Sequence, residues 1–253
     1  MAMALTVGGT GPEAPAADPA ARARALDVRY AHRPPHDILR LALDEQVAGR
    51  VALVSSFGAE SAVLLHMAAE VDADVPVIFV DTGRLFPETL AYKDRLVAEF
   101  GLSDVRIVGP EAAVAEVRDP LGAMFALDAD GCCGFRKVEP LAAALRPFDA
   151  WISGRKRYQA STREDIPTFE ASDAHVKINP LASWSMADVA AYLREHRLPP
   201  HPLVAAGYPS IGCAPCTTQV AAGEDARAGR WRGKDKTECG IHLPRHQTVG
   251  GAL

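Results

Sequence analysis

Short apolar runs rich in β-branched residues recur along the chain, and longer stretches with helical spacing of apolar positions separate them. The helical spacing is clearest in 59–71 and in 87–100, where Pro87 suits a first helical turn. Strands that alternate with helices predict an α/β fold, in which helices cover both faces of a mostly parallel, twisted sheet. The runs expected to form strands are 51–57, 75–81, 104–109, 149–154 and 174–181.

The pattern changes near residue 200. Residues 183–197 predict a helix that opens with a Ser cap, but beyond "LPPHP" (198–202) Gly, Pro and Cys increase and the periodicity fades. We therefore expect 203–243 to be an irregular, mobile and functional segment rather than a second domain. The expected organisation is a disordered lead-in over 1–17, one domain over 18–243 and a flexible tail over 244–253.

Composition and charge exclude several classes of function. The net charge of −5 gives no basic footprint for nucleic acid, so any anion site must be local. No apolar run approaches the ~20 residues needed to span a bilayer, and the N-terminus lacks the basic and apolar regions of a signal peptide. Five cysteines without an export signal predict reduced thiols in a cytoplasmic protein. A homo-oligomer is left open.

A small, hydroxyl-rich turn, "SSFGAES" (55–61), connects the first predicted strand to its helix. Backbone N–H groups at a helix N-terminus can hold phosphate or sulfate oxygens. Ser55, Ser56 and Ser61 add hydroxyl groups, and Gly58 lets an anion approach the backbone. The turn is not a Walker loop, because it lacks G-x-x-x-x-G-K-[ST]. On this motif alone, an anion site and a plain capped connection are equally supported.

The cysteines fall into two pairs and one single residue. Cys132 and Cys133 are adjacent, Cys213 and Cys216 form a C-x-x-C, and Cys239 stands alone in "KTECGIHL". Neighbouring Cα atoms lie about 3.8 Å apart, too close for the roughly 4.4–6.8 Å of a disulfide. Two pairs supply four soft ligands for zinc or an iron–sulfur cluster, and adjacent ligands favour a four-iron cluster over structural zinc. The remaining free thiol is a natural nucleophile.

Seven motifs together resemble those of the assimilatory sulfonucleotide reductases, over roughly residues 30–243. The resemblance is closest to the iron–sulfur-containing bacterial adenylyl-sulfate reductases, and it implies an adenine nucleotide alpha hydrolase-like fold. The motifs, in order, are "SSFGAES", "DTGRLFPET", "CCGFRKVEPL", "SGRKRYQASTR", "INPLASWS", "GYPSIGCAPCT" and "KTECGIHL".

The resemblance also implies a cofactor, a reaction and a partner. Cys132, Cys133, Cys213 and Cys216 would bind one [4Fe–4S] cluster per subunit. Cys239 would attack the sulfur of adenosine 5′-phosphosulfate, expel AMP and become an S-sulfocysteine. Thioredoxin, or a glutaredoxin-like reductant, would then attack the Cys239 sulfur and release sulfite for cysteine biosynthesis. The cluster would not need to change oxidation state, because thiols supply both electrons.

Anionic groups at both ends of the broken bond predict that positive side chains converge on the site. Lys137 lies inside the cysteine motif, where it would link cluster and sulfate. His242, three residues after Cys239, is a candidate to assist the thiolate or sulfonate, with a surface histidine equally supported. For the other cations, a solvated surface charge is the alternative. The cationic candidates are Lys137, Arg155, Arg157, Arg163, Arg230 and Lys236.

Other residues bear on which nucleotide binds. Asp81, Thr82 and Gly83 end the second predicted strand, so we expect them near the adenine or ribose. A 3′-phosphate would need a basic pocket, for which Arg84 is the candidate. We therefore expect adenylyl sulfate to be preferred, with 3′-phosphoadenylyl sulfate, or both, as the alternative.

Two further classes stay open at this point. One is an ATP-pyrophosphatase-type tRNA-modifying enzyme with a structural metal, which usually shows S-G-G-x-D-S. Phe57 and Glu60 depart from that motif and are taken here as part of the substrate loop. The other is a non-catalytic thiol switch, which the anion-binding loop disfavours. His66, in an apolar helix, is expected to pack in the core.

Overall fold

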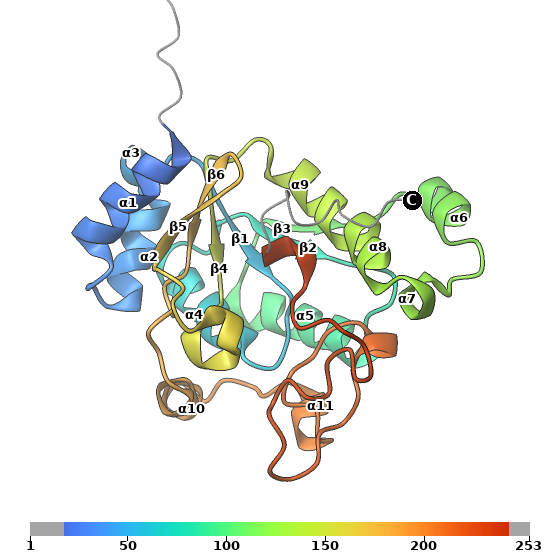
Figure 1. Cartoon of the computed structure of the whole chain (residues 1–253). Coiled ribbons are helices and arrows are strands. Elements are labelled where there is room, and N and C mark those ends of the chain that lie inside the picture. The colour runs from blue at the N-terminus through green and yellow to red at the C-terminus, as the bar shows by residue number, and fades with distance from the viewer. Residues whose placement is uncertain (1–17, 243–253) are drawn as a thin grey trace, which may run out of the picture.

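The computed structural model describes residues 18–242, which form a six-stranded sheet between layers of helices (Figure 1). The strand order is β3-β2-β1-β4-β6-β5, and every pair is parallel except β5–β6. The predicted α/β fold is therefore confirmed. The strands are β1 (Val51–Ser55), β2 (Val77–Val80), β3 (Val105–Val108), β4 (Ala150–Ser153), β5 (Phe169–Ser172) and β6 (His175–Ile178).

Alternating side chains of the strands serve two cores, as the two-residue period of a strand requires. Leu53 of β1 faces the larger core, whereas its neighbour Ala52 faces a smaller core with Trp151. Helix α9 (Glu139–Leu145) covers the smaller core. The larger core is covered by α1 (Pro19–Tyr30), α2 (Pro35–Leu43), α3 (Glu45–Ala48), α4 (Ser61–Val71), α5 (Pro87–Phe100) and α10 (Met186–Glu195).

Two details refine the sequence-based picture. Helix α10 begins after Ser185, whose hydroxyl accepts from the Asp188 N–H while the Asp188 carboxylate accepts from the Ser185 N–H, so the predicted cap is confirmed. Strand β5 was not predicted. Its four residues bury only Phe169, and it pairs antiparallel with β6 at the edge of the sheet. Such a short edge strand lacks an apolar run.

The chain reverses its direction of sheet growth between β1 and β4. It builds β2 and β3 on one side of β1 and then returns to add β4, β6 and β5 on the other. In open α/β sheets, ligands bind beyond the carboxyl ends of the strands at such a switch point. The loops that follow β1 and β4, residues 56–60 and 154–156, therefore meet at one place.

Residues 203–242, called here the C-terminal segment, contain little regular structure beyond the short helix α11 (Pro202–Ala205). The segment runs below the sheet in Figure 1 and returns to its centre, where Gly240–His242 pack on the π-helical turn Gly134–Val138. That turn continues α8 (Ala129–Cys133); α6 (Ala112–Arg118) and α7 (Met124–Leu127) precede it.

The predicted lead-in (1–17), the tail (244–253) and residue 243 lie outside the described residues. Within the described part of the chain, no helix combines the length and the apolar character that a membrane span requires.

Candidate active site

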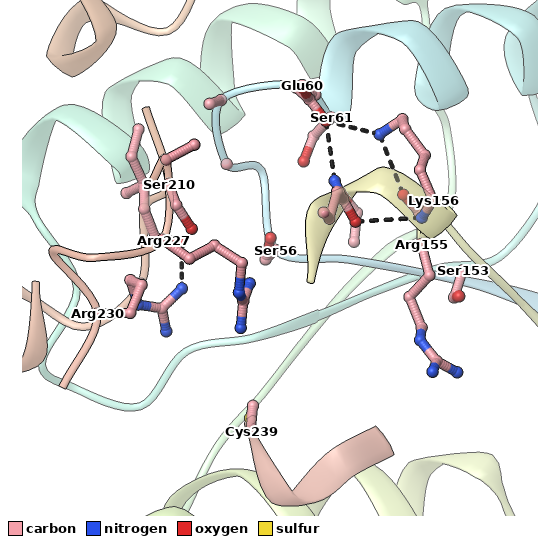
Figure 2. Close-up of a pocket in the computed structure, with 18 of the residues that line it drawn as sticks. Ser56, Glu60, Ser61, Ser153, Arg155, Lys156, Ser210, Arg227, Arg230 and Cys239 are labelled. Atoms are coloured by element: carbon pink, nitrogen blue, oxygen red, sulfur yellow. Dashed lines mark hydrogen bonds and ion pairs between the residues drawn. The ribbon is translucent and has the colours of Figure 1, made fainter. Parts of the chain in front are cut away.

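A cavity of about 550 Å³ opens at the switch point, between the loops after β1 and β4 and the C-terminal segment. Figure 2 shows Ser56, Glu60 and Ser61 on one side, Arg227 and Arg230 on a second, and Cys239 facing them from below. The cavity therefore combines an anion-type loop, positive side chains and a thiol.

The loop after β1 is fixed by contacts on both of its sides. Ser55 Oγ accepts from the Phe57 N–H at 3.1 Å, and Phe57, with a φ of 47°, packs edge-on against Phe79 in the core. Phe57 is fully buried and its side chain does not line the cavity. Ser56, Gly58 and Ser61 do line it. Phe57 thus anchors the loop, and only its backbone is placed to meet a ligand.

Glu60 joins the loop after β1 to the loop after β4. Its carboxylate accepts from Lys156 Nζ at 2.8 Å, the Tyr158 hydroxyl at 2.5 Å and Gln159 Nε2 at 2.9 Å. Burial raises the pKa of Glu60, but Lys156 and these hydrogen bonds outweigh burial and lower it. Glu60 is therefore an ionised crosslink within the cavity wall.

Two arginines of the cavity lining carry buried donors without a partner. The Nε atoms of Arg155 and Arg230 are buried, and none of the described residues partners either one. Burial lowers the pKa of both guanidinium groups, because their charges are incompletely compensated. Gly212 makes room for Arg230, since a Cβ there would stand 2.3 Å from the guanidinium. Buried donors without acceptors are costly, so this site suits an anionic ligand.

Cys239 lies at the floor of the cavity beside Lys137 and His242. A hydrogen bond from the Cys133 thiol, together with the charges of Lys137 and Arg230, lowers the pKa of Cys239 well below its usual value. The same contact raises the pKa of Cys133, whose thiol is the donor. The surroundings of Cys239 therefore favour a thiolate.

Lys137 and His242 differ in charge. Burial tends to lower the pKa of Lys137, but the sulfurs of Cys239, Cys213 and Cys133 outweigh it and raise the pKa. Lys137 thus lies between the cavity and the cysteine pairs as a cation. Burial and nearby cations lower the pKa of His242 well below its usual value, and its buried Nδ1 has no partner among the described residues. His242 is therefore a neutral imidazole with an uncommitted nitrogen.

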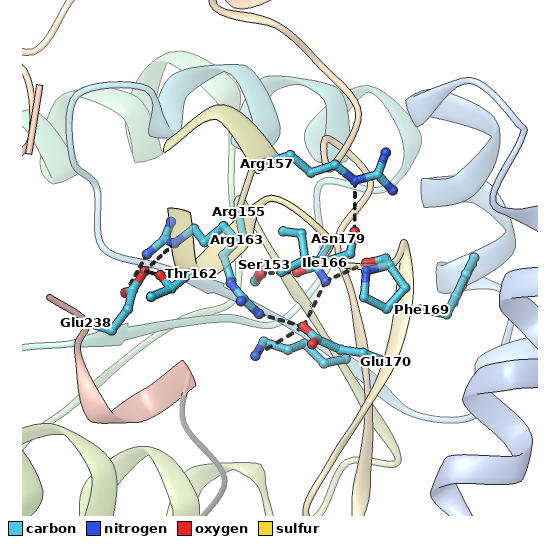
Figure 3. Close-up of polar contacts among 12 residues, drawn as sticks. Ser153, Arg155, Arg157, Thr162, Arg163, Ile166, Phe169, Glu170, Asn179 and Glu238 are labelled. Carbon is cyan, nitrogen blue, oxygen red and sulfur yellow. Dashed lines mark hydrogen bonds and ion pairs between the residues drawn. The ribbon is translucent and has the colours of Figure 1, made fainter. Parts of the chain in front are cut away.

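The residue before the thiol is held by a forked ion pair (Figure 3). The Glu238 carboxylate accepts from Arg163 Nε at 2.6 Å and Nη2 at 2.8 Å, and from the Thr162 hydroxyl at 3.1 Å. Burial raises the pKa of Glu238, but Arg163 outweighs it and lowers the pKa. Arg163 Nη1 also donates to Gln159 at 2.6 Å. Cys239 is thereby connected to the loop that holds Glu60.

The four paired cysteines lie together next to this floor. Cys132 interacts electrostatically with Cys213 and Cys216, and burial raises the pKa of Cys132 and Cys216. The Thr82 hydroxyl lies 3.2 Å from Cys213 Sγ. Within the described residues, the group of Cys, His and acidic side chains compact enough to ligate one ion lies elsewhere and contains no cysteine. The four sulfurs are therefore gathered less tightly than the ligand atoms of that group.

Besides Phe57, six of the predicted substrate residues do not line the cavity. The stretch that begins at Asp81 lies against the cysteines instead, since Thr82 meets Cys213 and the Arg84 carbonyl accepts from the Ala214 N–H. Arg157 Nε donates to the Ile166 carbonyl and shapes the loop. Their predicted contact with substrate is not tested, but their neighbours support a role in holding the site. The six are Asp81, Thr82, Gly83, Arg84, Arg157 and Lys236.

Several residues that the sequence analysis did not select also line the cavity. Lys156 stands inside the "SGRKR" motif, and Arg227 stands three residues before Arg230. The sequence pattern is therefore sufficient to identify both as candidates. Glu238 lies in the E-C-G-x-H motif, where the sequence gives no sign of its partner Arg163. Ser153, Gln159 and Ser210 carry no recognisable sequence signal; the fold brings them here.

Fold and site together define an adenine nucleotide alpha hydrolase-like protein with a thiol in its switch-point cavity. Residues 50–219 match the phosphoadenosine phosphosulfate reductase domain, and the chain belongs to that family. This membership argues against the tRNA-modifying and thiol-switch alternatives.

Individual relatives agree with this placement. The chain is 55% identical to an adenosine 5′-phosphosulfate reductase of Mesorhizobium japonicum, over 88% of each chain. It is 51% identical to another from Chelativorans sp., over 90% of this chain and 93% of that one. The crystal structure of phosphoadenylyl-sulfate reductase from Candida auris, in a phosphate complex, superposes with a TM-score of 0.67 and 26% identity, over 78% and 96% of the two chains.

Proposed function

We propose that this protein is a cytoplasmic enzyme of sulfate assimilation that reduces adenosine 5′-phosphosulfate to sulfite and AMP. The single observation that carries the proposal is the position of Cys239. Its thiol faces the serine loop across a cavity whose lining also includes Arg155 and Arg230. The names of the two bacterial relatives support the choice of substrate.

In the first step, the Cys239 thiolate attacks the sulfur of the substrate. A sulfur–sulfur bond forms, and the bond from sulfur to the phosphate oxygen breaks. AMP leaves with the electron pair, and an S-sulfocysteine stays on the enzyme. The loop around Ser56 and Gly58 is suited to hold the phosphate, as its backbone precedes the N-terminus of α4. Arg155, Arg230 and Lys137 are suited to stabilise the charge that moves onto the phosphate.

In the second step, a thiolate of thioredoxin attacks the Cys239 sulfur. The bond between the two sulfurs of the intermediate breaks, and sulfite leaves with the electron pair. The second thiol of thioredoxin then breaks the resulting mixed disulfide and restores Cys239, so that thioredoxin carries away the oxidation. Cys239 must be shielded in the first step and accessible in the second, which the polar attachment of the C-terminal segment would permit.

Cys132, Cys133, Cys213 and Cys216 are proposed to hold a [4Fe–4S] cluster. Four soft donors gathered more loosely than around one ion fit such a group. When bound, the cluster would supply a fixed charge distribution beside Lys137 and hold the two cysteine pairs together. Each thiol that ligates iron would give up its proton, so Cys133 would no longer donate to Cys239. Lys137 and Arg230 would then be the groups that favour the Cys239 thiolate.

The alternative substrate is the 3′-phosphorylated nucleotide. A relative from Gloeobacter violaceus, 46% identical over 76% of this chain, carries the name phosphoadenosine 5′-phosphosulfate reductase. Against this alternative, Arg84, the expected partner of a 3′-phosphate, lies outside the cavity lining with its Nη2 3.8 Å from Asp119. This position supports a preference for the unphosphorylated ribose.

The proposal is tested by mass spectrometry of the protein incubated with adenosine 5′-phosphosulfate and no reductant. One sulfonate should appear on Cys239, and thioredoxin should release it as sulfite. Cys239→Ser should gain no sulfonate; turnover by this variant would refute the assignment. The value of kcat/KM, measured for both nucleotides, should be higher for adenosine 5′-phosphosulfate. Equal values would indicate dual specificity and would leave the Cys239 chemistry intact.

A further inference from the structure

Three side chains of types that can ligate a metal meet where α4 and α10 pack together. His66 and Glu70 stand one turn apart on α4, and His196 follows the last residue of α10. Each offers one ligand atom, and these atoms all lie within 4.8 Å of one another. The sequence analysis expected His66 to pack in the core, but its side chain is only partly buried and lies 3.6 Å from Glu70.

We propose that His66, Glu70 and His196 form a binding site for one divalent ion of the zinc class. Two imidazoles and one carboxylate are the donors that zinc, cobalt and nickel accept, whereas magnesium and calcium prefer oxygen alone. Three protein ligands leave a position for water. Glu70 is exposed and both histidines are partly exposed, which gives the ion access from solvent.

The surrounding side chains orient these ligands. His36 Nε2 donates to Glu70 Oε2 at 2.9 Å, and the Tyr192 hydroxyl donates to the same oxygen at 3.2 Å. His66 Nδ1 lies 2.9 Å from the Tyr192 oxygen. Partners of this kind fix ligand geometry in metal sites and raise affinity. Without an ion, the same contacts would be only a hydrogen-bonded network. A measurement of metal binding therefore distinguishes a metal site from such a network.

The position of the site suggests what the ion would do. Leu64 of α4 and Leu193 of α10 line the switch-point cavity, and both helices belong to its wall. An ion held by the far end of α4 and the end of α10 would join the two helices and stiffen that wall. The expected effect is a higher Tm with metal bound and little change in the chemistry at Cys239.

The test is a titration of the purified full-length protein with cobalt(II), after iodoacetamide has blocked the free thiols and with any cluster retained. About one ion should bind per chain, without the near-ultraviolet charge-transfer absorption that cobalt–thiolate bonds give. His196→Gln and Glu70→Gln should weaken binding by more than tenfold, and His36→Gln by roughly tenfold. His32→Gln removes an exposed histidine outside the site and is the matched control.

Thermal unfolding with a chelator present checks that each variant folds. Zinc should then raise the Tm of the wild type and of His32→Gln, but not that of His196→Gln. The proposal is overturned if the wild type binds no cobalt, or if His196→Gln and Glu70→Gln bind it as tightly as the wild type. Neither result bears on sulfite release, so the two proposals fail separately.

Discussion

Two opposite walls of one cavity are held by different kinds of contact. One wall is formed by strands β1 and β4, and the other by the C-terminal segment. Leu53 and Ile152 in the strands are fully buried among aliphatic side chains. The C-terminal segment buries Leu203, Ile211 and Trp231, but polar contacts, such as Glu238 with Arg163, hold the stretch that carries Cys239. Apolar burial provides a permanent scaffold, whereas contacts that ligands or water can replace allow a segment to open locally. The thiol is carried by the wall that can open.

The largest expected effect comes from removing a proposed cluster ligand. Cys133→Ser should lose iron and lower activity by on the order of 10³-fold or more, because metal binding and local folding are coupled. Amide hydrogen exchange should speed up in the C-terminal segment and stay slow in β1 and β4. Cys239→Ser is the matched control, which should lose activity but retain iron and protection. Full iron and full activity in Cys133→Ser would contradict the ligand assignment.

A second experiment compares two lysines close to the thiol in space. Lys137 lines the cavity, whereas Lys236 pairs with Asp130 outside it. Lys137→Met should keep iron and lower kcat by about 10²–10³-fold, as for the loss of one transition-state donor. Lys236→Met should lower kcat much less than Lys137→Met does, because Lys236 lies outside the cavity lining and pairs with the exposed Asp130. Equal losses in the two variants would mean that net charge, rather than position, matters.

The third prediction concerns His201, which lies two residues before the C-terminal segment. Burial lowers the pKa of His201 to about 4, and its ring is fixed by the Thr89 hydroxyl and the Leu203 N–H. Below pH 6.5, the ordinary pKa of histidine, the His201 imidazole binds a proton in the unfolded chain but stays neutral in the native state. The contribution of His201 to the free energy of unfolding is therefore fully present above pH 6.5. It is lost as the pH falls toward 4, by at most about 3 kcal/mol.

Denaturant unfolding across this pH range measures the loss. His201→Asn retains an acceptor for the Leu203 N–H but cannot titrate, so its stability should depend less on pH between 4 and 6.5. An unchanged slope in this variant would assign the acid sensitivity to other groups.

The two walls also differ in how far the sequence predicts them. The five predicted strands follow from local apolar runs, and the cysteine pairs follow from spacing, so both could be found without a structure. The neighbours of Thr82 could not be predicted from the sequence. They depend on the bridge between Leu85 and Cys213, which joins residues far apart in the chain. The role of Glu238 likewise depends on Arg163, which only the fold brings to it.

The smallest effect is expected from the contact that attaches the thiol-bearing wall. Glu238→Gln keeps the shape of the side chain but weakens a buried, forked pair with Arg163. Cys239 should then be docked for a smaller fraction of the time, and kcat/KM should fall by about tenfold, equivalent to ~1.4 kcal/mol. Alkylation of Cys239 by iodoacetamide should become faster, a change that lost stability of the sheet would not produce. Glu224→Gln alters an exposed pair with Arg232 in the same segment and should leave both rates within about twofold. If the two variants behave alike, the Glu238–Arg163 pair does not control docking, and other contacts of the C-terminal segment, such as those of Lys234 and Trp231, must hold Cys239 in place.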